Sequence, residues 1–286
     1  MHISHVFDAK KPVISFEIFP PKKDAHNLAS IYMSLGKIAG LAPDFISVTY
    51  GAGGEGNVNR TCEIASAAKN GCGVEALAHL TCVQAERTHI HKLLNELRAN
   101  GIENVLAIRG DLPEGQTTAL PSDFHYASDL IREIKQHGNF CVAAACYPEG
   151  HISAPSLEQD IVHLKEKQDA GADFFITQLF FDNDLFWKFL DKARAAGITV
   201  PISAGVMPIL SRQQIERMVF LCGASLPASI IRMLHKYAHD PASLRQAGID
   251  HAVQQMQGLI AGGVDGVHAY TMNHPDIAMA VSRQIN

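Results

Sequence analysis

The stretch DAGADFFITQLFF (169–181) holds the kind of joint that decides the fold, because a helix end passes through a glycine into an apolar run. Gly171 suits the left-handed conformation that ends many helices, and a short apolar run is typical of a buried strand. The same succession recurs in ANGIENVLAI (99–108), AAGITVPIS (195–203) and AGGVDGVHAY (261–270). Its repetition indicates a series of β/α units.

Eight strand-like runs alternate with helical stretches along the chain. The predicted strands are 13–18, 45–50, 74–82, 105–110, 140–147, 174–181, 200–206 and 264–271. Helices are predicted at 25–39, 60–70, 86–99, 125–137, 156–170, 184–196 and 275–285, and three more between the last two strands at 211–221, 225–237 and 242–261. No linker divides the chain, so we predict an α/β fold in which residues 1–286 form a single (β/α)8 TIM-type barrel.

Composition and charge are those of an ordinary globular protein and argue against two classes of partner. The net charge of −5 leaves no basic footprint for nucleic acid or an anionic membrane. No apolar run reaches the ~18 residues of a membrane span, and the first residues show no secretory signal. The six cysteines form no CxxC pair and the histidines form no HExxH pattern, so we predict a cytoplasmic protein without a metal site.

Polar residues gather where the predicted strands end. In a (β/α)8 barrel the chemistry belongs at these C-terminal strand ends, because their loops surround one common mouth. The sequence places there Glu17, Thr49, His79, Thr81, Arg109, Asp111, Tyr147, Glu149, Gln178, Tyr270 and Thr271. Any one of these residues could simply be a solvent-exposed polar residue at the start of a loop. That alternative explains the whole set poorly, and we therefore predict an enzyme.

Two motifs and one amide bear on the ligand. GAGGEG (51–56) matches GxGxxG, but Glu75 begins the next strand instead of ending it, so we predict a loop beside a ligand and no dinucleotide fingerprint. Arg109 in RGDLPEG (109–115) offers paired donors to a phosphate or carboxylate, or forms a local ion pair with Asp111. Gln178 suits a heterocycle or serves as a core amide.

These motifs together resemble the methylenetetrahydrofolate reductase family in its short bacterial form. The matching segments occur in the family's order: SFEIFPPK (15–22), DFISVTYGAGG (44–54), EALAHLTC (75–82), LAIRGDLP (106–113), YASDLI (126–131), AAACYPEGH (143–151), DAGADFFITQLFFD (169–182), GVMPI (205–209) and HAYTMN (268–273).

The resemblance implies a flavoprotein that binds FAD without a covalent bond at the mouth of the barrel. NADH or NADPH reduces the flavin and leaves, and 5,10-methylenetetrahydrofolate then enters the same site and is reduced to 5-methyltetrahydrofolate. Positions that match FAD contacts are Thr49, Ala52, His79, Arg109, Gly110, Asp111, Tyr126, Ala127, Ala145, Tyr147, His151, Asp160 and Lys167. Positions assigned to the folate site are Glu17, Gln178, Gln214, Met218 and His274. A homo-oligomer is the expected assembly.

Two carboxyl groups are expected to share this chemistry. Glu17 lies in the apolar run PVISFEIFPPKK (12–23), and an apolar surround disfavours the charged form of a carboxylic acid. We expect Glu17 to give its proton as the methylene bridge opens to a 5-iminium cation. Asp111, kept ionised, would stabilise that cation and adjust the flavin.

Three positions depart from the family pattern. His274 stands where arginine is common, Glu166 where a basic residue is common, and Met218 where phenylalanine is common. At these positions the resemblance implies that His274 affects contact with the glutamyl tail of folate and that Glu166 weakens attraction to the FAD phosphates. Met218 would affect packing against folate or nicotinamide. Two alternatives stay open: another flavin barrel, such as a proline dehydrogenase-like oxidoreductase, and a flavin- or folate-binding subunit that takes electrons from a partner protein.

Overall fold

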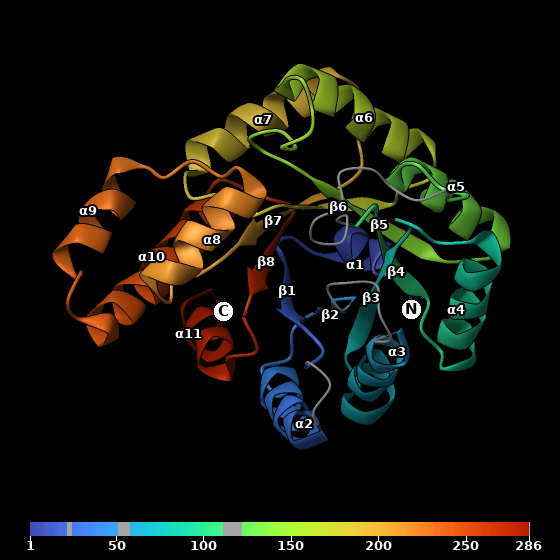
Figure 1. Cartoon of the computed structure of the whole chain (residues 1–286), viewed down its shortest axis with the longest axis horizontal. Helices are drawn as coiled ribbons and strands as arrows, with labels where there is room; N and C mark the ends of the chain where they lie inside the picture. The colour runs from blue at the N-terminus through green and yellow to red at the C-terminus, as the bar shows by residue number, and fades with distance from the viewer. Residues whose placement is uncertain (22–24, 51–57, 111–121, 286) are drawn as a thin grey trace.

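The structure is a computed structural model that describes residues 1–21, 25–50, 58–110 and 122–285 (Figure 1). Within these residues, eight parallel strands close into a barrel in chain order, and β8 pairs with β1. The strands are β1 Val13–Ile18, β2 Phe45–Val48, β3 Glu75–Thr81, β4 Asn104–Ile108, β5 Cys141–Cys146, β6 Phe174–Thr177, β7 Ile202–Val206 and β8 Gly266–Tyr270. The predicted (β/α)8 barrel is confirmed.

Helices surround the barrel, as Figure 1 shows. They are α2 Ala25–Ala39, α3 Val58–Ser66 with the π-helical turn Ala67–Gly71, α4 Arg87–Ala99, α5 Ala127–His137, α6 Leu157–Asp169, α7 Asn183–Ala195, α8 Arg212–Cys222, α9 Ala228–Lys236, α10 Pro241–Ala261 and α11 Pro275–Ile285. The three helices predicted between the last two strands are confirmed as α8, α9 and α10. None of the described helices is long and apolar enough to cross a membrane.

One short helix, α1 Ser4–Ala9, was not predicted. It lies at the centre of the ring of helices in Figure 1, and its apolar side chains fill the barrel lumen at the end where the strands begin. Phe7 of this helix packs on Phe174 of β6, with ring centroids 5.1 Å apart. Ile3 and Val6 join the same buried cluster. The polar mouth therefore lies above an apolar floor.

The sixth strand is shorter than predicted. It ends at Thr177, whereas the apolar run continues to Phe181. Beyond the strand, Leu179 and Phe181 pack into a separate apolar cluster with Ile215 of α8. The prediction of 174–181 was wrong at its end because apolar residues mark burial, and this burial is against a helix.

Side-chain bonds reinforce the seam between β1 and β8, the first and last strands. Ser15 Oγ lies 2.8 Å from His268 Nδ1, and Thr271 Oγ1 donates to the backbone oxygen of Glu17 at 2.6 Å. The Asn273 side chain accepts from the N–H and donates to the carbonyl of Phe19, both at 2.9 Å. These contacts fix the backbone on both sides of Glu17.

Candidate active site

Glu17 points from β1 into the mouth of the barrel, where two histidines face it. Its Oε2 lies 3.7 Å from Nε2 of His79 on β3 and 3.6 Å from Nε2 of His268 on β8. The expected apolar surround of Glu17 is therefore wrong. Strand alternation sends the apolar neighbours Phe16 and Ile18 outward into the core beneath the helices, and imidazole rings face the carboxyl instead.

His79 is buried and uncharged at neutral pH. Burial lowers its pKa to about 4; the Glu17 carboxyl opposes this effect and His268 adds to it. Its Nε2 lies 2.5 Å from the hydroxyl of Ser47 on β2. His79 therefore faces Glu17 as a neutral hydrogen-bonding group and not as a counter-ion.

Tyr270, the last residue of β8, joins the end of its strand to the end of β6 at the mouth of the barrel. Its hydroxyl donates to the backbone oxygen of Thr177 at 2.7 Å, and its ring stands edge-on to His268. Burial, followed by the nearby Glu17 carboxyl, raises the pKa of Tyr270 well above its usual value. Gly205 makes room for this arrangement, because a Cβ there would lie 2.3 Å from the Thr177 oxygen and 2.8 Å from the Tyr270 hydroxyl.

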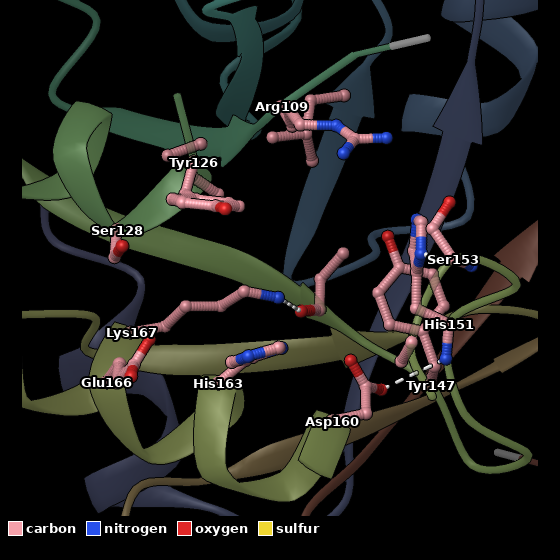
Figure 2. A pocket seen from close by; sticks show the side chains of 15 residues that line it. Arg109, Tyr126, Ser128, Tyr147, His151, Ser153, Asp160, His163, Glu166 and Lys167 are labelled. Carbon is pink, nitrogen blue, oxygen red and sulfur yellow. Dashed lines mark hydrogen bonds between the residues drawn. The ribbon is translucent and has the colours of Figure 1, made fainter. Parts of the chain in front are cut away.

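A pocket of about 290 Å³ lies at the ends of β4 and β5, beside helices α5 and α6. Figure 2 shows Arg109 and Tyr126 on one side and Lys167, His163 and Asp160 of α6 on the other. The pocket is lined by Ala107, Ile108, Arg109, Tyr126, Ala127, Ser128, Ala145, Tyr147, His151, Ser153, Ala154, Asp160, His163, Glu166 and Lys167. Cationic and aromatic groups together suit a ligand that carries both phosphate and a flat ring.

Helix α6 supplies charge to this pocket from one face, because Asp160 and Lys167 lie two turns apart. Lys167 Nζ donates to the carbonyl of Ala145 at 2.8 Å and lies 5.5 Å from the centroid of the Tyr147 ring (Figure 2). Burial lowers the pKa of Lys167, and Asp160 acts in the opposite direction. Asp160 also accepts the backbone N–H of His151 at 3.1 Å, which ties the loop after β5 to the helix.

The structure brings most of the predicted FAD contacts together. This pocket includes Arg109, Tyr126, Ala127, Ala145, Tyr147, His151, Asp160 and Lys167. Thr49 and Gly110 follow β2 and β4, and Gly110 has a positive φ of 86° and no free space for a Cβ beside Val83. Ala52 and Asp111 lie outside the described residues, as do the GAGGEG motif and most of RGDLPEG. The FAD assignments remain predictions.

The four folate positions other than Glu17 differ in how they are held. Gln178 follows β6, and its Oε1 accepts the N–H of the next residue at 2.9 Å. Gln214 Oε1 accepts the N–H of Leu210 at 2.7 Å, and its amide donates to another carbonyl of that loop at 3.2 Å. Met218 packs against the apolar cluster beneath α8. His274 is exposed before α11.

Sequence reasoning missed several residues of this region. Ser128, Ser153, Ala154 and His163 line the pocket, and His268 faces Glu17. The spacing of His163 from Asp160 and Lys167 was a usable signal, because residues three and four apart share a helix face. His268 lies two residues before Tyr270, and the strand period of two places both on the same side.

These features define a class of protein: a (β/α)8 barrel with an acid at its mouth and, at the ends of β4 and β5, a slot whose cationic and aromatic lining suits an anionic, aromatic ligand. Among known proteins, the family model described as methylenetetrahydrofolate reductase matches residues 2–286. The chain belongs to the methylenetetrahydrofolate reductase family.

Curated relatives agree with this assignment. The chain is 34% identical to 5,10-methylenetetrahydrofolate reductase of Escherichia coli (strain K12), with 94% of this chain and 88% of the relative covered. It is 35% identical to methylenetetrahydrofolate reductase (NADH) 1 of Arabidopsis thaliana, with 98% of this chain covered. The chain spans about half of that plant relative, 49% of its length.

A solved structure shares the fold. An uncharacterized protein from Clostridium thermocellum, described as binding two copies of 5-methyl-5,6,7,8-tetrahydrofolic acid, superposes with a TM-score of 0.67. The two sequences are 15% identical, and the match covers 100% of this chain and 99% of the other. At that identity the likeness supports the barrel alone.

Proposed function

We propose that this chain reduces 5,10-methylenetetrahydrofolate to 5-methyltetrahydrofolate, with FAD as the resident cofactor and NADH or NADPH as the electron donor. The observation that carries the proposal is that a chain of this family holds both Glu17 at the barrel mouth and a cationic and aromatic slot at the ends of β4 and β5. NADH is the favoured donor by analogy with the short bacterial members.

The slot fits the nucleotide half of FAD. Arg109 and Lys167 offer charged donors for the diphosphate, and Tyr126 and Tyr147 offer aromatic faces. A volume of about 290 Å³ is at the low end for a ligand pocket, and Thr49 and Gly110, which do not line it, are the further residues that would hold the flavin. When bound there, FAD supplies the hydride that the substrate carbon receives.

Glu17 is assigned the proton transfer that opens the substrate. The bond between the methylene carbon and N10 breaks, its electron pair goes to N10, and N10 takes the proton of Glu17. The substrate is left as the 5-iminium cation and Glu17 as a carboxylate. That carboxylate then faces His79 and His268, which are buried and excluded from bulk water. We propose that Asp111 stabilises the cation.

Anaerobic stopped-flow measurement of the two half-reactions tests this assignment. In Glu17→Gln we expect flavin reduction by NADH at the wild-type rate and reoxidation by methylenetetrahydrofolate slowed by about 10²- to 10⁴-fold, the usual contribution of a general acid. Glu86→Gln, a matched change at an exposed residue, should alter neither rate. Equal losses in both half-reactions of Glu17→Gln would assign the residue a structural role.

The same apparatus separates the alternatives. A protein that binds no flavin would contradict the proposal outright. A flavin-bound protein that free NADH and NADPH do not reduce would indicate a subunit served by a partner protein. Reduction of its flavin by proline would indicate a proline dehydrogenase-like activity.

A further inference from the structure

The pairing of β1 with β8 ends at Glu17 itself. Glu17 lies opposite Tyr270 in the last register position that these two strands share, and β1 continues beside β2 for only one residue more. Pro20 and Pro21 come soon after and have no backbone N–H to donate. The proposed acid therefore stands where the regular backbone hydrogen bonds between β1 and β8 stop.

Side chains that follow β8 take the place of those backbone bonds. The Asn273 side chain accepts the N–H of Phe19 at Oδ1 and donates from Nδ2 to the carbonyl of the same residue, both at 2.9 Å. The N–H must face an oxygen and the carbonyl a nitrogen, so these partners determine the orientation of the amide. Thr271 Oγ1 also donates to the Glu17 carbonyl at 2.6 Å. The backbone from Glu17 to Phe19 is thus attached to β8 by side chains.

The turn after β8 is shaped to present this amide. Met272 and Asn273 both have positive φ, 52° and 60°, a conformation that persists in non-glycine residues only where the surroundings hold it. The N–H of His274 donates to the Thr271 carbonyl at 2.9 Å, and the Ser34 hydroxyl of α2 donates to the Asn273 carbonyl at 3.5 Å. Asparagine combines tolerance of this φ with a donor and an acceptor on one short side chain.

The Glu17 carboxyl depends on the backbone that carries it. Its Oε2 lies 3.7 Å from His79 Nε2 and 3.6 Å from His268 Nε2, and both separations exceed a hydrogen bond. Among the residues that the structure describes, no hydrogen bond holds this carboxyl in place. A shift of the β1 backbone would therefore move the carboxyl with it.

We propose that Asn273 is a positioning residue for the proton transfer: it holds the end of β1 so that the Glu17 carboxyl stands where N10 of the substrate can take its proton. The inference rests on the acid role given to Glu17 in the proposed function. A proton donor must come within about 2.6–3.2 Å of its acceptor, and a misplacement of about 1 Å can cost about 100-fold in rate. Asn273 exchanges no proton in this scheme and acts through the backbone.

A double-mutant cycle in the flavin-loaded enzyme tests this role. Asn273→Gly removes the amide and leaves a residue that adopts positive φ without steric cost. The change is made alone and together with Glu17→Gln, and the rate of flavin reoxidation by methylenetetrahydrofolate is measured in each enzyme. Ala42→Gly is the control, because Ala42 is exposed, has a positive φ of 53° and precedes β2 at the end of the barrel away from the mouth.

In Asn273→Gly we expect reoxidation to be about ten-fold slower than in the wild type, with flavin reduction by NADH at the wild-type rate. In the Glu17→Gln background the same change should slow reoxidation by less than about two-fold more, because no acid is left to position. Flavin content and the NADH half-reaction show that each variant is folded. Ala42→Gly should match the wild type in both half-reactions.

Three outcomes would overturn the inference while leaving the proposed function in place. One is an unchanged reoxidation rate in Asn273→Gly. Another is the same loss in both backgrounds, which would show that Asn273 does not act through Glu17. The third is a variant that loses its flavin or its NADH half-reaction, which would assign Asn273 a structural role. A Glu17→Gln enzyme reoxidised at the wild-type rate would instead overturn the acid role in the proposed function, and the inference with it.

Discussion

The burial of His79 predicts that the barrel loses stability in mild acid. The pKa of His79 is lowered from 6.5 to about 4 in the folded protein, chiefly by burial. Between these two values the unfolded chain binds a proton that the folded chain does not. Stability therefore falls as the pH decreases through this range, and the loss is complete once the folded protein also binds the proton below about 4.

The size of the effect follows from the two pKa values. The two pKa values differ by about 2.5 pKa units, and each unit corresponds to 1.36 kcal/mol. His79 alone should therefore lower the free energy of unfolding by about 3 kcal/mol as the pH falls through this range. That is a large share of the ~5–15 kcal/mol that stabilises a typical domain. The amide side chain introduced by His79→Gln cannot take up the proton.

Urea unfolding, followed by circular dichroism from neutral pH down to about pH 4, measures this difference. The unfolding free energy of His79→Gln should fall by about 3 kcal/mol less than that of the wild type over the range. His89→Gln, at an exposed histidine of α4, should retain the wild-type slope. Parallel curves for wild type and His79→Gln would refute the reasoning, whatever their absolute stabilities.

Two further substitutions test the mouth and the slot. Gly205→Ala should lower the unfolding free energy by about 1–3 kcal/mol, because the added Cβ would lie 2.8 Å from the Tyr270 hydroxyl. Gly36→Ala is the control, because in the described structure the added Cβ would meet no atom within 4 Å apart from its chain neighbours and its own helix backbone; this change should not destabilise the protein. Lys167→Met should raise the Kd for FAD about ten-fold or more, since it removes a cation from the slot. A flavin fluorescence titration that gives an unchanged Kd would place the FAD diphosphate elsewhere.

Much of the barrel could be predicted from local patterns. The glycine joints at 171, 197 and 263 adopt positive φ, as a left-handed helix end requires. Helix α1 could not be found in this way, because it is only six residues long and is stabilised by packing on Phe174, which lies far away in the chain. Local propensity carries little information about such a contact.

The candidate site was predictable as a set of strand ends but not as a set of environments. Glu17 lies at the end of β1, as predicted. The apolar residues next to it in the sequence predicted an apolar surround, and that prediction was wrong. Side chains from β3 and β8, more than sixty and two hundred and fifty residues away, face the carboxyl. Their identity follows from barrel closure and register, and neither can be read within one strand.

The side-chain bonds along the seam between β1 and β8 have a consequence for the order of folding. Closing a loop costs about (3/2)RT ln n, which is about 5 kcal/mol for some 250 residues and about 3 kcal/mol for the roughly 30 residues between most neighbouring strands. Ser15 and His268, like Asn273 and Phe19, are separated by more than 250 positions. We therefore expect this strand pair to form last. The recovery of catalysis during refolding should lag behind the burial of the aromatic core, because the acid and the imidazole that faces it meet only when the seam closes.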